Sequence, residues 1–295
     1  MACLASELTR EALWDAFLKR RVYGVTGDRI GLDFRVNDAV MGSCIVAAGS
    51  RTLRVSVTGS DALDRVEVLR NGRVVHTYCH QGTWRVPEPV QHSRFKFRVE
   101  AGWGPFVGEA MERGPWRWSG ALTLPETARF MAFEPCWTSA GQERPVLTRN
   151  RATFAILASP IHSAELSVSR TYNANVFEFE ARSEDALTVA VDGLNCETTV
   201  GDLCAGSRVL WHDIESRDAL KSRFGLDVDM FERPTFNYLL SYKAKLHRII
   251  PEAGYTAAFE IVDDEPIEAE VNYRIRVEQR NGQKAWSSPV WVRPN

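Results

Sequence analysis

The chain has 295 residues, of which 44% are hydrophobic and 25% are charged, a composition typical of globular proteins rather than disordered ones. This length allows two ordinary domains, each with its own core. The 36 basic and 38 acidic residues give a formal net charge of −2. The composition therefore argues against nucleic acid and anionic membranes as partners.

Neither membrane insertion nor secretion is indicated by the sequence. No apolar run approaches the roughly 18–20 residues that a membrane-spanning helix needs. The N-terminal segment is too short, and turns polar too soon, for a signal peptide. We therefore expect no membrane partner and a cytoplasmic location. Six scattered cysteines without a Cys-x-x-Cys pair favour reduced thiols; Cys196 and Cys204 could pair across a short loop only if oxidised.

The first thirty residues predict a helix followed by a turn. Thr9 is a suitable N-cap residue, and glycines at 24 and 27 are expected to end the helix. Four residues at helical spacing form one apolar face: Leu13, Trp14, Phe17 and Leu18. This face must pack on the rest of the chain, meet another chain or remain exposed. Exposed patches of this kind mark interaction sites, so we predict association through this helix.

From residue 30 onward the hydrophobic period changes to two, which indicates half-buried strands. The expected strands lie at residues 30–36, 53–57, 66–68, 74–75, 95–99, 116–118, 154–157, 176–179, 187–191, 273–277 and 285–292. The dipeptides Asn71-Gly72, Asp192-Gly193 and Asn281-Gly282 favour hairpin turns. Short strands separated by such turns are typical of sandwiches and barrels.

These patterns predict a mainly β chain of two antiparallel, Ig-like β-sandwich domains preceded by one short N-terminal helix. The helix and turn occupy residues 1–29, the first sandwich 30–124, a proline-containing connection 125–150 and the second sandwich 151–295. Strands and helices do not alternate after residue 30, which argues against a doubly wound parallel sheet.

One histidine cluster could hold a metal ion. His76, Cys79 and His80 offer imidazole and thiolate groups, which suit zinc. On a strand, however, the two histidines share one face and Cys79 points to the other. Packing at a strand end is therefore the favoured interpretation, and His76 and His80 are weak metal candidates.

Two further segments could carry chemistry. His212 stands beside Asp213 with Glu215 nearby, and could act as a general base. Adjacent residues of an extended chain face opposite ways, so a polar loop is the better interpretation. The glycine-bearing segment 24–29 could hold a phosphate through its backbone N–H groups. It lacks the Lys-Ser/Thr of a P-loop, and a helix C-terminus is favoured.

Nine tryptophans also allow a carbohydrate-binding interpretation, because aromatic faces stack on sugars. The candidates are Trp84, Trp103, Trp116, Trp118 and Trp137. Large aromatic residues more often fill sandwich cores. A binding groove would require at least two of them to be exposed together.

Three stretches, at residues 8–30, 65–72 and 273–291, resemble the C-terminal half of a large bacterial family. Members of that family join an N-terminal PHP-type metallohydrolase barrel to C-terminal β-domains. The first stretch contains Leu-Thr-Arg-Glu-Ala-Leu-Trp-Asp-Ala, and the last ends in Ala-Trp-Ser-Ser-Pro-Val-Trp. The resemblance implies that residues 1–29 are the remnant of the barrel's end.

The resemblance also implies that the catalytic centre lies outside this chain. The family's metal ligands, in motifs such as His-x-His, belong to the barrel that precedes the segment beginning here at about Leu4. This chain has no His-x-His, so we expect no catalytic residue and no cofactor in it, and divalent metals only in the absent barrel. If a barrel were docked beside the helix, Tyr23, Thr26 and Arg29 would form a loop at its rim.

These considerations predict a non-catalytic β-sandwich protein with a structural or partner-binding role. Its partner would be a separate barrel-containing chain, or a second copy bound through the N-terminal helix. One alternative is a fragment of a longer metal-dependent hydrolase whose barrel lies upstream. Another alternative is a carbohydrate-binding module. Fold class alone does not decide between them.

Overall fold

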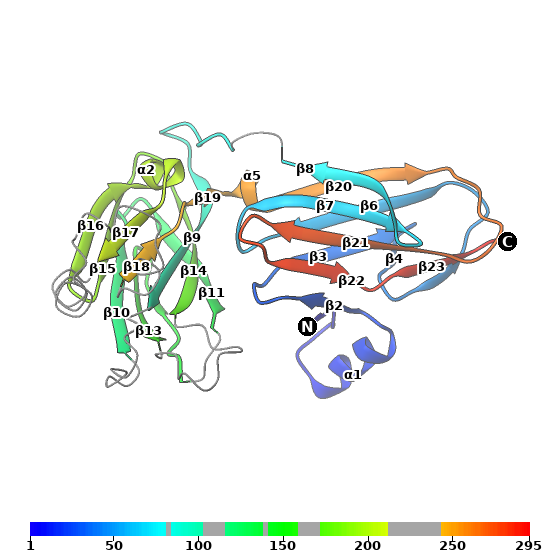
Figure 1. Ribbon diagram of the computed structural model, residues 1–295, viewed down its shortest axis with the longest axis horizontal. Helices are drawn as coiled ribbons and strands as arrows, with labels where there is room; N and C mark the ends of the chain where they lie inside the picture. Colours follow the sequence, from blue (N-terminus) through cyan, green and yellow to red (C-terminus); the bar gives the residue numbers. More distant parts are fainter. Residues whose placement is uncertain (81–83, 103–115, 138–140, 159–171, 212–242) are drawn as a thin grey trace, which may run out of the picture. The chain divides into compact units, whose positions relative to one another are not determined.

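The computed structural model of the chain describes residues 1–80, 84–102, 116–137, 141–158, 172–211 and 243–295. Strands dominate these residues and the helices are short, so the expected mainly β class is confirmed. The chain forms two compact units (Figure 1). The discontinuous unit comprises Met1–Arg85 and Glu252–Asn295, and the inserted unit comprises Val86–Pro251.

Two sheets make up the described part of the discontinuous unit. The first has the order β1 (Ala2–Cys3), β2 (Val22–Val25), β22 (Lys284–Ser287), β21 (Val271–Gln279), β23 (Val290–Arg293), β5 (Cys44–Val46), and β7 (Leu63–Arg70) pairs with both β21 and β8 (Arg73–Cys79). The second has the order β20 (Thr256–Asp263), β6 (Arg51–Thr58), β3 (Gly31–Val36), β4 (Ala39–Val40). One pair departs from the antiparallel expectation, because β5 runs parallel to β23.

The core of the discontinuous unit lies between these two sheets. Alternate residues of β3, β6 and β21 point inward. The buried cluster includes Phe34, Val55, Val66, Val68, Tyr273 and Ile275. The expected hairpin between β7 and β8 is confirmed, since Asn71 and Gly72 have φ values of 48° and 83°. Positive φ at both turn positions matches the right-handed twist of the flanking strands.

Strands from the two ends of the sequence pair inside this unit, which differs from the expected domain boundaries. Ile275 of β21 lies opposite Val68 of β7, and Ile261 of β20 lies opposite Leu53 of β6. Residues 30–124 and 151–295 therefore do not form separate sandwiches. Alternation locates a strand and its buried face, but it does not identify the strand's partner.

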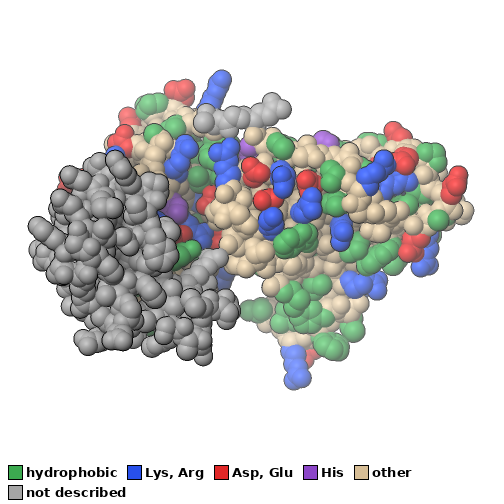
Figure 2. Space-filling view, viewed as in Figure 1, with side chains coloured by type: hydrophobic (Ala, Val, Ile, Leu, Met, Phe, Trp, Pro, Cys, Tyr) green, Lys and Arg blue, Asp and Glu red, His purple; other side chains and the backbone are tan. Residues whose placement is uncertain are grey.

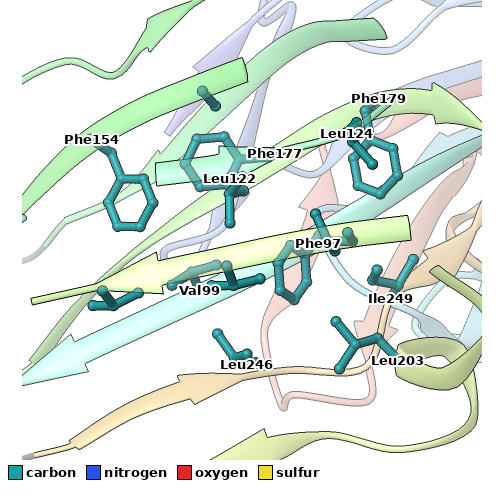
Figure 3. Packing of buried hydrophobic residues seen from close by; sticks show 14 of the residues in the cluster. Phe97, Val99, Leu122, Leu124, Phe154, Phe177, Phe179, Leu203, Leu246 and Ile249 are labelled. Carbon is teal, nitrogen blue, oxygen red and sulfur yellow. The ribbon is translucent and has the colours of Figure 1, made fainter. Parts of the chain in front are cut away.

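The inserted unit also has two described sheets around one core. The first has the order β12 (Val146–Leu147), β13 (Arg151–Ala158), β10 (Trp116–Thr123), β15 (Ala186–Val191), β16 (Leu194–Thr199). The second has the order β11 (Arg129–Cys136), β14 (Tyr172–Ala181), β9 (Ser93–Gly102), β18 (Lys243–Leu246), β17 (Arg208–Trp211), with β19 (Ile250–Pro251) also pairing with β9. Aromatic residues fill the core, and Figure 3 shows Phe97, Phe154, Phe177 and Phe179 packed with Leu122.

The expected connection at 125–150 contains two strands of the inserted unit, β11 and β12. Phe133 of β11 lies opposite Phe177 of β14, and Pro135 lies opposite Asn175. The prolines of this segment suggested a connection. Among the described strands, however, β11 lies at the edge of its sheet. An edge strand tolerates proline because one side of its backbone needs no ladder partner.

The structure has helices beyond the one expected at the N-terminus. Besides α1 (Arg10–Leu18), the described residues include α2 (Val200–Ala205) and α5 (Glu252–Tyr255). Both additional helices are too short to show a helical period in the sequence. Within the residues described, none of these helices has the length and apolar character needed to cross a membrane.

Candidate partner-docking surface

Helix α1 begins where the sequence predicts. Thr9 is its N-cap, and the Thr9 hydroxyl oxygen accepts a hydrogen bond from the backbone N–H of Ala12 at 3.3 Å. This bond satisfies one of the backbone donors that the first helical turn leaves open. The helix ends at Leu18, earlier than the glycines at 24 and 27 suggested, and Gly24 lies inside β2.

The predicted apolar face of α1 is largely exposed. The exposed fraction is 63% for Trp14, 64% for Leu18 and 40% for Phe17, and Ala16 is the helix residue that is buried. Leu8, just before the helix, is 91% exposed. We call Leu8, Leu13, Trp14, Phe17 and Leu18 the α1 face. Figure 2 shows hydrophobic side chains gathered over this helix.

A lock at the end of α1 fixes the helix to the sheets of its unit. Arg20 takes a left-handed backbone conformation with φ of 56°, and its guanidinium donates to the carbonyl oxygen of Gly42 at 3.2 and 3.1 Å. The same guanidinium lies 5.0 Å from the ring centre of Trp291, within cation–π range. Gly42 has φ of 90°, and a Cβ there would collide with the carbonyl oxygen of Lys19.

A buried carboxylate holds the loop that follows β2. Asp28 is 2% exposed and accepts hydrogen bonds from Gln279 Nε2 at 2.9 Å and Asn281 Nδ2 at 2.6 Å. Gln279 Oε1 in turn accepts from the backbone N–H of Ser60 at 2.8 Å. A satisfied buried network of this kind rigidifies the segment that carries it.

Strand β2 and this loop together bring the three residues predicted for a barrel rim close to one another. Tyr23, Thr26 and Arg29 line one open depression of about 670 Å³, together with Met1. The backbone N–H of Lys284 donates to the Thr26 hydroxyl oxygen at 2.9 Å. Burial raises the pKa of Tyr23. The Arg29 side chain is exposed. The depression exists, while its role as a barrel rim stays a prediction.

The histidine cluster packs against an aromatic neighbour. His76 and Tyr78 of β8 lie with ring centres 5.2 and 5.3 Å from that of Phe259. Cys79 is exposed. His76, Tyr78 and His80 lie on one face, as expected for every second residue of an extended chain. Among the described residues, no group of three or more His, Cys, Asp or Glu side chains is placed to hold a metal ion.

The tryptophans differ in environment. Trp118 is fully buried in the core of the inserted unit. Trp137 is half-buried and its indole N–H donates to Asn175 Oδ1 at 3.0 Å, and Trp84 is half-buried as well. The carbohydrate-binding alternative stays a prediction, because Trp103 and the side chain of Trp116 lie outside the described residues.

The remaining candidate residues form no catalytic site or disulfide among the described residues. His212, Asp213 and Glu215 lie outside the described residues. Cys196 and Cys204 lie in β16 and α2, and both are free thiols. Burial raises the pKa of Cys204 to about 12, against the opposing charge of Arg248, so this thiol is a poor nucleophile at neutral pH.

One cluster was missed by sequence reasoning, a charged layer on the face of β9 that points away from the core. Lys96, Arg98 and Glu100 alternate with core residues exactly as solvent-facing residues would, yet all three are buried. Arg98 Nε lies 3.2 Å and His247 Nε2 lies 3.0 Å from the Glu100 carboxylate. Alternation gives the same pattern for a solvated face and a covered one, so no signal could have revealed this layer.

Burial and neighbouring charges set the pKa values in this layer. Burial acts to raise the pKa of Glu100, but the hydrogen bond and charge of His247, with the charge of Arg98, lower it overall. Lys243 is fully buried, and this burial, together with the charge of Lys245, lowers its pKa to about 7. Perturbed groups of this kind occur in functional sites and in structural ion networks alike.

Sequence comparisons find bacterial relatives of uncharacterised function. A 115-residue segment is 37% identical to an uncharacterised protein of Chlamydia pneumoniae and covers 36% of this chain but 18% of that protein. Segments of 87 residues are 30% and 29% identical to uncharacterised proteins of Chlamydia muridarum and Chlamydia trachomatis serovar D, covering 28% of this chain and 14% of each relative. The match thus spans less than a fifth of each relative's length. No protein-family model and no solved structure matches the chain.

Proposed function

We propose that this chain is a non-catalytic, partner-binding β-protein whose α1 face docks a folded domain. The observation that carries the proposal is an apolar helix face fixed in an exposed position, with Trp14 and Leu18 each more than 60% exposed. The lock between Arg20, Gly42 and Trp291 fixes the helix before any partner binds. A preorganised face of this kind binds at a lower entropic cost than a mobile one.

The docked domain in this proposal is a PHP-type barrel, in a separate chain or in the same longer polypeptide. The resemblance of residues 8–30 to the end of such a barrel supports this choice. Met1 also lines the depression beside Tyr23 and Arg29, so a domain joined before Met1 would begin at this surface. Divalent metals would belong to the barrel, both units of this chain would be Ig-like sandwiches, and the protein would be cytoplasmic.

A binding experiment tests the docking. The full chain is titrated calorimetrically with a PHP-type barrel domain expressed from a longer protein that carries a similar C-terminal region. We expect saturable binding, weakened at least about 30-fold by Trp14→Ala, because truncating a central aromatic anchor costs about 2 kcal/mol or more. Val146→Ala, an exposed apolar residue of the inserted unit, serves as the control. Absence of binding, or equal binding by both variants, would refute the proposal.

The partial coverage of longer relatives supports a second form of the same proposal, in which the chain is part of a longer polypeptide. The resemblance to the PHP-type family is what would make that polypeptide a metal-dependent hydrolase. Metal analysis of the purified chain and a phosphoester screen with added manganese and zinc test it. We expect no turnover by the chain alone, and turnover after fusion to the upstream barrel. Turnover by the chain alone would contradict both forms.

A further inference from the structure

The charge at the centre of the α1 face is a single arginine. At about 100° per residue, Arg10 projects between Phe17 and Trp14, in the middle of the exposed arc. Arg10 lines the same shallow depression of about 590 Å³ as Leu13, Trp14 and Phe17. The other charged side chains of the helix, Glu11 and Asp15, project to one side of this arc.

Helix stability does not explain an arginine at this position. Arg10 is the first helical residue, where the positive end of the helix dipole disfavours a cation. Asp15 pairs with Lys19 at 2.8 Å, whereas no ion pair or side-chain hydrogen bond of Arg10 occurs among the described residues. A residue that destabilises its own helix, and gains no ion pair or hydrogen bond in return, is often retained for function.

We propose that Arg10 is the charged anchor of the docking surface, and that the partner presents a carboxylate inside an apolar patch. This inference rests on the proposed docking function. Closing an apolar surface over Arg10 removes water from its guanidinium, which is costly unless an acceptor replaces the water. A carboxylate does so with two parallel hydrogen bonds. Apolar patches without a carboxylate are then rejected, which gives the surface its specificity.

A second copy of the chain does not meet this requirement. Two α1 helices packed antiparallel about Trp14 would place Arg10 against Leu18 of the copy, which has no carboxylate. A nine-residue helix is also only about 14 Å long. Its face alone falls short of the roughly 800 Å² per partner of a stable interface. Any partner must therefore also cover residues flanking the helix.

A peptide selection can identify which residue types bind the α1 face while the partner itself is unknown. A phage-displayed library of helical peptides is selected against the full chain and depleted against the Trp14→Ala variant. We expect enriched peptides to combine apolar residues with a central Asp or Glu. Recovery of apolar peptides without a carboxylate, or of no Trp14-dependent peptide, would overturn the inference.

Affinity measurements on the best peptide then test the contact itself. We expect Arg10→Glu to weaken binding roughly 30-fold or more, because one member of a desolvated pair is replaced by a repelling charge. Arg10→Lys should weaken it less, since it keeps the charge but loses the bidentate geometry. Arg274→Glu, an equal charge change at an exposed strand residue, is the control and should bind normally.

The two proposals fail in distinguishable ways. If the barrel binds, Trp14→Ala abolishes that binding and Arg10→Glu leaves it unchanged, the docking function holds and the Arg10 inference fails. If the barrel does not bind but carboxylate-bearing peptides do so through Arg10, the barrel is the wrong partner and the inference holds.

Discussion

Helices α1 and α2 start in the same way and end in opposite environments. Both follow a threonine N-cap, Thr9 and Thr199, whose hydroxyl oxygen accepts a backbone hydrogen bond. In α2, Val200, Leu203 and Cys204 are buried, and Figure 3 shows Leu203 beside Ile249 in the core of the inserted unit. In α1, Trp14, Phe17 and Leu18 are exposed instead.

The difference shows that local sequence starts a helix but does not decide what covers it. α2 is tied to its own core, since the backbone N–H of Ile249 donates to the carbonyl oxygen of Leu203 at 3.1 Å. α1 is tied to its unit mainly through its C-terminal end, by Arg20 and Gly42. An apolar face that adds little to the fold of its own chain is available to a partner.

The largest expected contrast comes from truncating one side chain in each helix. Leu203→Ala should lower the free energy of unfolding by about 3 kcal/mol, because it leaves a cavity in a closed core. Trp14→Ala should change it by less than about 0.5 kcal/mol, because that side chain is exposed. Urea denaturation of both variants measures the difference. Equal losses would mean that the α1 face is packed in solution.

The lock at the end of α1 should be the next most sensitive feature. Gly42→Ala should cost about 2 kcal/mol, since it combines a disfavoured φ with a collision against the Lys19 carbonyl. Faster hydrogen exchange of the α1 amides would report the loosened helix. Gly72→Ala is the control, because its φ is similar but no atom lies within 4 Å of the added Cβ. Equal exchange rates in the two variants would argue against the lock.

Alkaline pH should lower the stability of the folded chain through ionisation of the Cys204 thiol in α2. Burial raises the pKa of Cys204 from 9.0 to about 12, so the folded state keeps a proton that the unfolded state releases. This contribution to stability is complete below pH 9 and is lost between about pH 9 and 12, at up to about 1.4 kcal/mol per pH unit. Denaturation of the chain and of Cys204→Ala between pH 8 and 10.5 isolates it. Parallel pH profiles would contradict the prediction.

The smallest expected difference between α1 and α2 comes from removing their N-cap hydroxyl groups. Thr9→Ala and Thr199→Ala should each cost about 1 kcal/mol of helix stability. We expect Thr199→Ala to lower the unfolding midpoint of the chain, and Thr9→Ala to appear only as local fraying in hydrogen exchange. A lowered global midpoint for Thr9→Ala would show that α1 is more strongly coupled to its unit than the exposure of its face indicates.

Residue patterns predicted the local structure well and the tertiary arrangement poorly. The cap at Thr9, the face around Trp14 and the turn at Asn71-Gly72 follow from chemistry within a few residues, and the structure confirms each of them. The pairing of Ile275 with Val68 depends on residues about two hundred positions apart. No local pattern encodes that pairing.

The candidate surface shows the same limit. Periodicity identified the α1 face, and the resemblance to a known family identified the loop with Tyr23, Thr26 and Arg29. Neither could show that Arg20 fixes the helix, because its partner Gly42 is distant in sequence. The burial of Glu100 was equally hidden, since a charged residue on a strand is normally expected to face solvent.

The insertion of one unit into the other imposes an order on folding during synthesis. Phe95 near the start of the inserted unit lies opposite Pro251 at its end, so this unit is complete when residue 251 has emerged. β7 must wait for β21 to be translated, which takes about 10–40 s at ribosomal rates of 5–20 residues per second. During that interval the early strands of the discontinuous unit remain open-edged nascent chain, the form that chaperones recognise and that aggregates most readily.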